Sequence, residues 1–197
     1  MKNIIFIAML FLPCMLFAQQ NWKPWGVGEA GLLFGTYELS GDLRLQGGMK
    51  KGGWLLGAGA GTDGYRLNSI PVYAQVRKMM GNKNMKPFVM GSFGANFAGK
   101  IDPPFEDLSF VTMLARPDLF VPPVSTYRTG TYVDFGAGLA FRTHKKFGFN
   151  LSLSYTRKTQ VEDVTQSIFN GTGGIETTTN TNKYMMNRYA FRIGMQL

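Results

Sequence analysis

Tyr189-Ala190-Phe191-Arg192-Ile193-Gly194-Met195-Gln196-Leu197, at the carboxyl end of the chain, decides the fold class. Large apolar side chains alternate there with small or polar ones. Because successive side chains of a strand point to opposite faces, this period of two gives the strand one apolar and one polar face. The same pattern recurs in Val133 to Phe141 and in Phe147 to Tyr155. Several such strands in one exported chain predict a closed membrane β-barrel.

The amino terminus predicts export. Lys2 precedes an apolar stretch from Ile4 to Phe17, and the small residue Ala18 ends that stretch before polar residues begin. This order is typical of a secretory signal peptide, and the stretch is shorter than the roughly 20 apolar residues of a membrane-spanning helix. We expect residues 1–18 to be a cleaved signal peptide and residues 19–197 to form one outer-membrane β-barrel domain.

Cysteine usage and charge narrow the classes of function. Cys14 is the single cysteine, so the exported chain would hold no disulfide. Acylation of Cys14 in a lipoprotein is an alternative, although Pro13 stands where a small residue is expected. Without the signal peptide the chain keeps 20 of its 21 basic residues against 12 acidic ones, a formal charge of +8. The basic residues are scattered at strand ends, which disfavours nucleic acid and favours anionic lipid headgroups as partners.

Alternating segments bounded by glycine fill the rest of the chain. Each is long enough for a tilted strand of about 9–11 residues that crosses a membrane. Eight segments predict an all-β fold, an eight-stranded antiparallel up-and-down transmembrane β-barrel. They are Trp25 to Thr36, Leu39 to Lys50, Gly53 to Gly64, Ser69 to Met79, Pro87 to Ala98, Thr129 to Thr143, Phe147 to Arg157 and Tyr184 to Leu197.

The connections between these strands predict their sides. Three connections are compact and basic, at Lys50 to Gly53, Gly81 to Asn84 and His144 to Lys146, whereas residues 99–128 and 158–183 form long connections. Outer-membrane barrels of Gram-negative envelopes have short periplasmic turns and longer outer loops. We therefore expect both termini in the periplasm and the two long loops outside the cell.

Parity along each strand assigns the two faces. The predicted lipid-facing set is apolar: Leu43, Leu45, Ile70, Val72, Val76, Val89, Phe93, Phe97, Val133, Phe135, Leu139, Phe141, Phe149, Leu151, Leu153, Phe191, Ile193 and Met195. The predicted interior set is a charge network: Glu29, Asp42, Arg44, Asp63, Arg77, Asp134, Arg142, Arg188 and Arg192. Buried charges are usually paired. Since eight strands leave an interior just wide enough for side chains, we expect a filled barrel, with a narrow small-solute channel as the alternative.

Aromatic residues near the strand ends predict two interfacial girdles. One girdle would lie toward the short turns and the other toward the long loops. Their members would be Trp25, Trp54 and Phe147 on the first side, and Tyr37, Tyr65, Tyr132, Tyr155 and Tyr184 on the second.

A family resemblance rests on two adjacent strands. The run Trp54-Leu55-Leu56-Gly57-Ala58-Gly59-Ala60-Gly61, followed by Ile70-Pro71-Val72-Tyr73-Ala74-Gln75-Val76-Arg77, is similar to the third and fourth strands of small outer-membrane β-barrel proteins of Bacteroidota. From about residue 26 onward the chain resembles that group, which includes the OmpA-transmembrane-like and PorT-like barrels. Leu197 departs from the terminal Phe of many such barrels. The resemblance implies insertion by the barrel-assembly machinery and specifies no chemistry.

The two long loops differ in composition. Residues 99–128 combine five prolines with apolar residues, and Pro104 to Arg116 reads as a short helix. Because a solvated loop would not carry so much apolar surface, it is a candidate partner-binding loop or a lid packed on the barrel mouth. The candidate contact residues are Phe105, Leu108, Phe110, Met113 and Phe120. Residues 158–183 are rich in Thr, Asn and Gly and predict a mobile, hydrated loop, or else a hairpin that continues the last two strands above the membrane.

Basic residues at the outer strand ends form a candidate rim for lipopolysaccharide phosphates. They are Arg66, Lys100, Arg128, Arg157, Lys158 and Lys183. Snorkelling side chains at a lipid surface would look the same.

The inventory of reactive side chains disfavours an enzyme. His144 is the single histidine, and its predicted periplasmic turn is far from outer-leaflet lipid. No catalytic, cofactor-binding or metal-binding residues are expected. A secreted lipocalin-like lipid-binding barrel, with the two faces inverted, is a further alternative. Its Gly-x-Trp signature is absent, since Trp22 and Trp25 precede Gly26.

These observations predict a non-enzymatic, monomeric outer-membrane barrel in contact with membrane lipid and lipopolysaccharide. A structural, adhesion or binding role would be carried by the loops 99–128 and 158–183, toward an extracellular ligand that the sequence does not identify.

Overall fold

The computed structural model describes residues 22–35, 39–64, 68–81, 84–98, 124–142, 147–169 and 175–197. The predicted signal peptide and the short helix predicted at 104–116 lie outside these ranges. The described strands are β1 (Lys23–Gly35), β2 (Leu39–Lys51), β3 (Trp54–Asp63), β4 (Ser69–Met79), β5 (Met85–Ala98), β6 (Val124–Arg128), β7 (Gly130–Arg142), β8 (Gly148–Phe169) and β9 (Ile175–Gln196). Within the described ranges no helix is long and apolar enough to cross a membrane.

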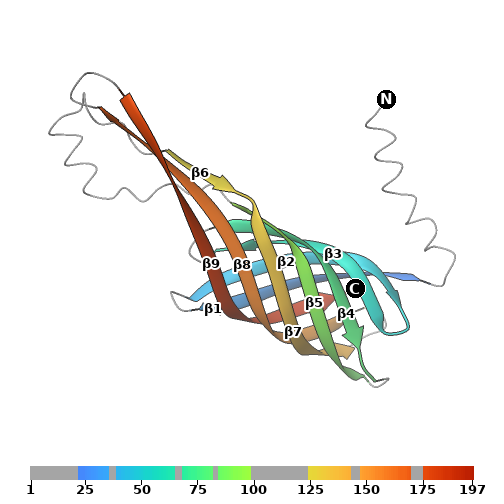
Figure 1. Cartoon of the computed structure of the whole chain (residues 1–197). Coiled ribbons are helices and arrows are strands. Elements are labelled where there is room, and N and C mark those ends of the chain that lie inside the picture. The colour runs from blue at the N-terminus through green and yellow to red at the C-terminus, as the bar shows by residue number, and fades with distance from the viewer. Residues whose placement is uncertain are drawn as a thin grey trace, which may run out of the picture.

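Eight of these strands close into a barrel (Figure 1). Each pairs antiparallel with its neighbours in chain order, and β9 closes the ring because it pairs with β1 on one edge and β8 on the other. Closure satisfies the backbone hydrogen bonds of every wall strand without leaving an open edge. The predicted eight-stranded antiparallel barrel is confirmed.

Positive-φ glycines make the tight connections. Lys51 pairs with Trp54, so Gly52 and Gly53 form a two-residue turn with φ angles of 54° and 83°. Two positive φ angles are what a type I′ hairpin turn requires, and glycine adopts them without a steric penalty. The turn lies at the end of the barrel where β1 begins and β9 ends, which we call the terminal mouth.

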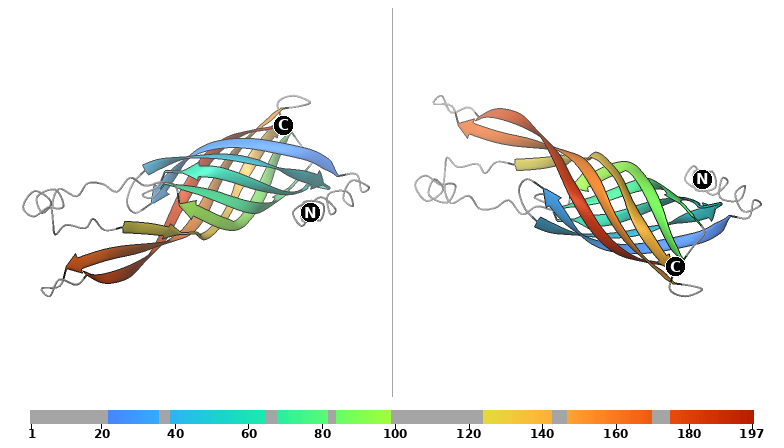
Figure 2. Two further views of the ribbon diagram at one scale, coloured as in Figure 1. Left: turned by 90° about the horizontal axis from the view of Figure 1, so that it is seen from above. Right: turned by 90° about the horizontal axis from the view of Figure 1, so that it is seen from below.

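The last two strands run well past the barrel wall. β8 and β9 each have 22 residues, and their pairing continues from Thr159 opposite Met185 to Phe169 opposite Ile175. β6 adds a third strand, because Arg128 pairs with Val161 and Val124 with Thr165. We call β6 with residues 159–169 and 175–185 the extension; Figures 1 and 2 show it projecting beyond the barrel.

The extension corrects one sequence expectation. Most of residues 158–183 are paired strand, so the mobile, hydrated loop is wrong and the hairpin that the sequence left open is the observed arrangement. The physical reason is β-branching. Val161, Val164 and Thr165 pair with Lys183, Asn180 and Thr179 across the hairpin, and β-branched residues favour strands.

The two faces of the wall have opposite character. The predicted lipid-facing residues lie on the outside, with Leu45 at 74% exposure and Phe93 at 67%, whereas Val133 and Phe141 are half-buried. This direction excludes the inverted faces of a soluble lipid-binding barrel. Trp25 and Tyr132 correct the girdle prediction, because both are buried inside the barrel. Trp54, Phe147 and Tyr155 are exposed and Tyr184 is half-buried, while Tyr37 and Tyr65 lie outside the described ranges.

Small residues on β3 make room for large interior side chains. A methyl group on Gly57 would lie 3.0 Å from the ring of Trp25, and one on Gly59 would lie 2.9 Å from the ring of Tyr73. The neighbouring side chains therefore fold over β3 and fill the interior, as expected for eight strands.

Candidate functional site

The barrel interior holds the buried charges of the described residues. They are the acids Glu29, Asp42, Asp63 and Asp134 and the bases Arg44, Arg77, Lys158, Arg188 and Arg192. Four negative and five positive side chains leave a small net positive charge. Because a lone buried charge is very costly, the pairing within this set decides whether the barrel is stable.

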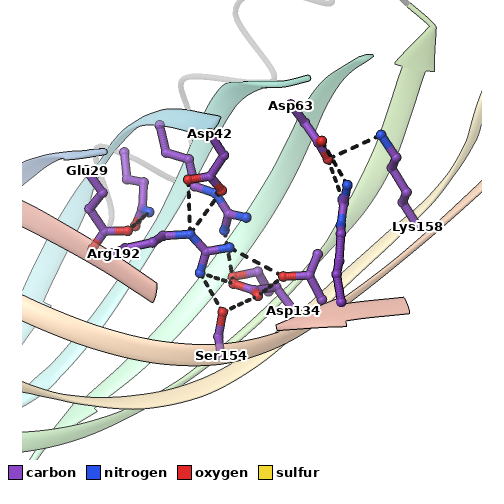
Figure 3. Close-up of polar contacts among 12 residues, drawn as sticks. Glu29, Asp42, Asp63, Asp134, Ser154, Lys158 and Arg192 are labelled. Atoms are coloured by element: carbon purple, nitrogen blue, oxygen red, sulfur yellow. Dashed lines mark hydrogen bonds and ion pairs between the residues drawn. The ribbon is translucent and has the colours of Figure 1, made fainter. Parts of the chain in front are cut away.

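The central cluster joins four strands, β2, β7, β8 and β9, across the barrel interior (Figure 3). Arg44 Nε lies 2.7 Å from Asp42 and its Nη1 lies 3.0 Å from Asp134. Arg192 of β9 bridges the same two acids, at 3.0 Å and 3.5 Å. Ser154 and Thr156 donate hydrogen bonds to the remaining oxygen of Asp134, at 2.8 Å and 2.6 Å. Each carboxylate is thus shared by two guanidinium groups, which fixes the register of distant strands.

A second cluster lies toward the terminal mouth. Arg77 Nη2 is 2.8 Å from Glu29 Oε1. Gln46 and Asn150 donate hydrogen bonds to the same carboxylate, at 2.9 Å and 3.1 Å. The guanidinium of Arg77 also lies 4.4 Å from the ring centroid of Phe88, a cation–π contact that partly compensates its desolvation.

A third cluster lies toward the extension and includes a residue that the sequence placed elsewhere. Asp63 accepts a hydrogen bond from Arg188 Nη1 at 2.8 Å and forms an ion pair with Lys158, whose Nζ lies 3.3 Å away. Lys158 also donates to Ser69 Oγ at 3.0 Å. Lys158 is fully buried, so its assignment to the lipopolysaccharide rim is wrong.

Two tyrosines pack between the clusters. The rings of Tyr73 and Tyr132 stack with centroids 5.3 Å apart, and the Arg44 guanidinium lies 5.4 Å from the second centroid. Separate groups of buried apolar side chains lie near each end of the barrel: Trp25, Val27 and Leu55 at the terminal mouth, and Leu33, Met186 and Ala190 toward the extension.

The structure distributes the predicted interior residues as follows. Eight of the nine are buried inside the barrel, and Arg142 is the exception. Arg142 keeps inward parity but is exposed at the end of β7, beyond buried Ala140, so its assignment to the buried network is wrong. Lys158, at the opposite end of the barrel, is a buried base that the predicted network did not include. Its signal was the unbroken inward row Ser152, Ser154, Thr156, Lys158 and Gln160, which continues past the predicted end of β8.

Other predicted residues divide between exposed and undescribed positions. Arg128, Arg157 and Lys183 are exposed near or within the extension. Arg66 and Lys100 lie outside the described ranges. So do all candidate contacts of the first long loop, which are Phe105, Leu108, Phe110, Met113 and Phe120. In the ranges that the structure describes, no three His, Cys, Asp or Glu side chains gather as metal ligands.

The extension has its own polar cluster, built on Glu162. Tyr127 of β6 and Tyr184 of β9 donate hydrogen bonds to its two carboxylate oxygens, at 2.9 Å and 2.8 Å. Partial desolvation acts to raise the pKa of Glu162, but the hydrogen bonds from Tyr184 and Tyr127 outweigh it and lower that pKa. Desolvation and the hydrogen bond to Glu162 raise the pKa of Tyr127 to about 12. One carboxylate therefore ties the three strands together.

A second link lies on the other face of the extension. Arg128 Nε is 2.8 Å from Asp163, and Thr181 donates to the same carboxylate at 2.7 Å. The hydrogen bond from Thr181, followed by that from Arg128, lowers the pKa of Asp163. Both faces thus cross-link β6, β8 and β9, which makes the extension a braced three-stranded sheet.

No protein-family model matches this sequence, and no curated protein matches it either. Among solved structures, the chain is similar to the crystal structure of Neisserial surface protein A (NspA), with 8% sequence identity over 89% of this chain and 96% of that chain and a TM-score of 0.54. It is also similar to the outer membrane protein OprG from Pseudomonas aeruginosa, with 10% identity over 89% of this chain and 95% of that one and a TM-score of 0.50. At such identities the likeness concerns the fold alone, and it agrees with the strand pairing: this chain is a small eight-stranded antiparallel β-barrel.

Proposed function

We propose that this protein is a monomeric, non-enzymatic barrel of a Gram-negative outer membrane that conducts no solute and presents its extension to a binding partner at the cell surface. The observation that carries the proposal is the combination of an apolar outer wall with an interior closed by paired charges. Lipid as the surrounding solvent explains why large apolar side chains face outward and every buried carboxylate has a cation.

The orientation follows from the lengths of the projections. Outer-membrane barrels keep their short turns in the periplasm and their long projections outside. The two-residue turn at Gly52 and Gly53 would then lie in the periplasm with both chain termini, and the extension would lie outside. Arg128, Arg157 and Lys183 would meet lipopolysaccharide phosphates at the outer rim. Barrel-assembly machinery would insert the chain into the membrane. Residues 54–61 and 70–77, whose sequences are similar to strands of the Bacteroidota barrels, support a relation to that group.

A cross-linked sheet suits recognition better than transport. Binding costs less when the surface is already ordered, since fewer residues lose freedom on association. Tyr127, Tyr184 and Glu162 supply that order on one face, and Arg128 with Asp163 supplies it on the other. The partner would be an extracellular molecule or surface in a binding, adhesion or structural role.

Membrane location and orientation can be tested with cysteines, since Cys14 is the only native one and belongs to the expected signal peptide. Thr178→Cys at the extension should react with a membrane-impermeant maleimide on intact cells, whereas Asn84→Cys at the terminal mouth should react only after the outer membrane is permeabilised. Equal labelling of the two on intact cells would contradict the orientation.

Conduction and binding need separate measurements. The purified protein in a planar bilayer should give no reproducible single-channel steps; regular steps would instead support the small-solute channel.

For binding, Val161 and Lys183 face each other across β8 and β9, so residues 162–182 can be replaced by Asn-Gly as a two-residue turn. This variant should keep the folded barrel's mobility in unboiled electrophoresis samples. It should lose partner adducts formed by a photoreactive side chain at position 185 on intact cells, and retention of those adducts would contradict a binding role for the extension.

A further inference from the structure

An open cavity of about 830 Å³ lies at the terminal mouth, outside the buried charge network. Its basic lining residues are Lys23, Lys50, Lys51, Lys86 and Arg142, and among the described residues that line it, which also include Gln196 and Leu197, there is no aspartate or glutamate. Its floor is apolar, formed by Leu55, Met79 and Ala140. We call this cavity the terminal vestibule.

The vestibule is built by strand parity. Lys23, Lys50, Lys86 and Arg142 continue the inward-facing rows of β1, β2, β5 and β7, one step or two beyond the last buried side chain of each row. Four of the eight wall strands therefore point a cation into the same mouth.

The strand register places two of these cations next to each other. Lys23 and Lys50 are direct cross-strand partners in the pairing of β1 with β2. Like charges directly opposite each other destabilise a sheet. The neighbouring cations Lys86 and Arg142 add to this repulsion across the mouth. A bound anion would turn the repulsive arrangement into a set of favourable contacts.

The size and chemistry of the cavity limit the ligand. Its volume lies in the range of small-molecule sites, roughly 300–1,000 Å³. Lysine ammonium groups act as point charges for phosphate, and the guanidinium of Arg142 can bind phosphate with two parallel hydrogen bonds. Five cations around one cavity call for several negative charges in a compact group. The apolar floor separates that group from the interior, so it would bind at the mouth and would not pass through the barrel.

We propose that the terminal vestibule binds a compact phosphate-bearing anion, either a soluble one or the headgroup of an anionic phospholipid. The argument uses the barrel geometry alone and holds for either orientation in the membrane, so it can fail independently of the proposed function.

The experiment is isothermal titration calorimetry of the full folded chain in a maltoside detergent, which carries no phosphate. Inorganic tripolyphosphate is the soluble probe. Dihexanoyl phosphatidylglycerol is the lipid probe, and zwitterionic dihexanoyl phosphatidylcholine is its control. Saturable binding of tripolyphosphate supports a soluble source, and binding of the phosphatidylglycerol but not the phosphatidylcholine supports a headgroup. The proposal is overturned if neither tripolyphosphate nor phosphatidylglycerol binds.

Variants localise the binding. Lys50→Gln with Lys86→Gln should lower the affinity about tenfold or more, since each removed charge loses a charge-assisted contact. The matched control is Lys78→Gln: Lys78 lies near the same end of the barrel but outside the cavity lining, with its ammonium 4.3 Å from the centroid of Trp54, and its loss should change the affinity by less than about twofold.

Two further readouts separate a lost site from a lost fold. Lys50→Arg with Lys86→Arg should retain binding, because it keeps both charges. Unboiled electrophoretic mobility should be the same for all variants. Unchanged affinity in the glutamine double variant, or an equal loss in the Lys78→Gln control, would assign the binding to overall charge and overturn the proposal.

Discussion

Arg192 donates from Nε to Asp42 Oδ2 at 3.0 Å, and the two residues lie 150 positions apart in the sequence. Asp42 belongs to the second strand and Arg192 to the last, with β1 between them in the wall. This contact therefore crosses the seam where the first and last strands of the barrel meet. An interior ion pair, in addition to the backbone ladder, holds the ring closed.

The first prediction concerns that seam. Arg192→Met should lower the free energy of unfolding by about 3–5 kcal/mol, because it leaves Asp42 and Asp134 to share Arg44 as their only strong cation. Denaturant unfolding in detergent measures the change. Arg157→Met is the control, since that side chain is exposed and its loss should cost less than about 0.5 kcal/mol. A small effect of Arg192→Met would mean that water, and not the ion pair, solvates this part of the interior.

The second prediction uses the shared carboxylate of Asp63. Asp63→Asn leaves both Arg188 and Lys158 without their acid and should cost about 3–5 kcal/mol. Lys158→Met should cost clearly less, because Asp63 keeps Arg188. The order of the two unfolding free energies decides the test. If Lys158→Met lowered the free energy of unfolding more than Asp63→Asn, Arg188 would not be the main partner of Asp63.

The third prediction concerns interior packing. A methyl group on Gly138 would overlap the backbone oxygen of Leu151 and would lie 2.5 Å from Cζ of the Phe88 ring, so Gly138→Ala should lower stability by about 1–3 kcal/mol. Gly28→Ala is the matched control, because its methyl group would meet Leu45 at an ordinary 3.4 Å. Thermal unfolding compares the two variants, and equal midpoints would show that the Leu151 backbone and the Phe88 ring both adjust at little cost.

The fourth prediction is a pH dependence of the extension. The folded-state pKa of Glu162 is lowered from its usual value of 4.5, so its contribution to stability is present above that value. The contribution is lost as the pH falls below 4.5 through the lowered folded pKa. The protection factors of backbone amides in residues 160–166, which compare the measured exchange rate with the intrinsic rate at each pH, should therefore fall on acidification in this range.

Glu162→Gln provides the control for the pH effect. Its amide cannot titrate, so the protection factors in the extension should be lower at neutral pH and should change less on acidification. Asp163 would supply what remains of the pH response, since hydrogen bonds from Thr181 and Arg128 lower its pKa too. An identical response in wild type and variant would exclude Glu162 as the titrating group.

The fifth prediction concerns the solvent on each side of the wall. A spin label at Leu151, which is exposed on the outside, should be accessible to oxygen dissolved in lipid, whereas one at buried Asn150 should not. Electron paramagnetic resonance in lipid vesicles measures both. The opposite accessibility would place the polar face against lipid and contradict a membrane barrel.

Parity along the strands explains how much of this architecture is readable from the sequence. Glu29, Asp42 and Asp134 occupy alternate positions among apolar outward neighbours, and a period of two fixes their side of the wall without further information. Trp25 and Tyr132 obey the same rule. Their position near strand ends predicts girdle residues. Parity instead places Trp25 on the same face as Val27, and Tyr132 on the same face as Asp134, which is the interior face that the structure shows.

Strand length and pairing partners were harder to predict. Residues 159–169 are too polar to show a lipid-facing pattern. Hydropathy therefore predicts that the strand ends at Arg157, although its backbone pairing continues. For this reason Lys158 is absent from the predicted interior network. Partner choice depends on how far each side chain reaches across several strands. Its predicted interior position indicates that Asp63 needs a cation as partner. Which cation it meets, Arg188 and Lys158 in the structure, depends on how the strands are shifted relative to one another in the closed barrel.

β8 and β9 pass from the wall into the extension without a break in their pairing. The eleven residues of β8 in the extension, at roughly 3.3 Å each, extend about 35 Å in a direction set by the tilt of the wall. A pull on the extension would therefore act directly on the two strands that close the barrel.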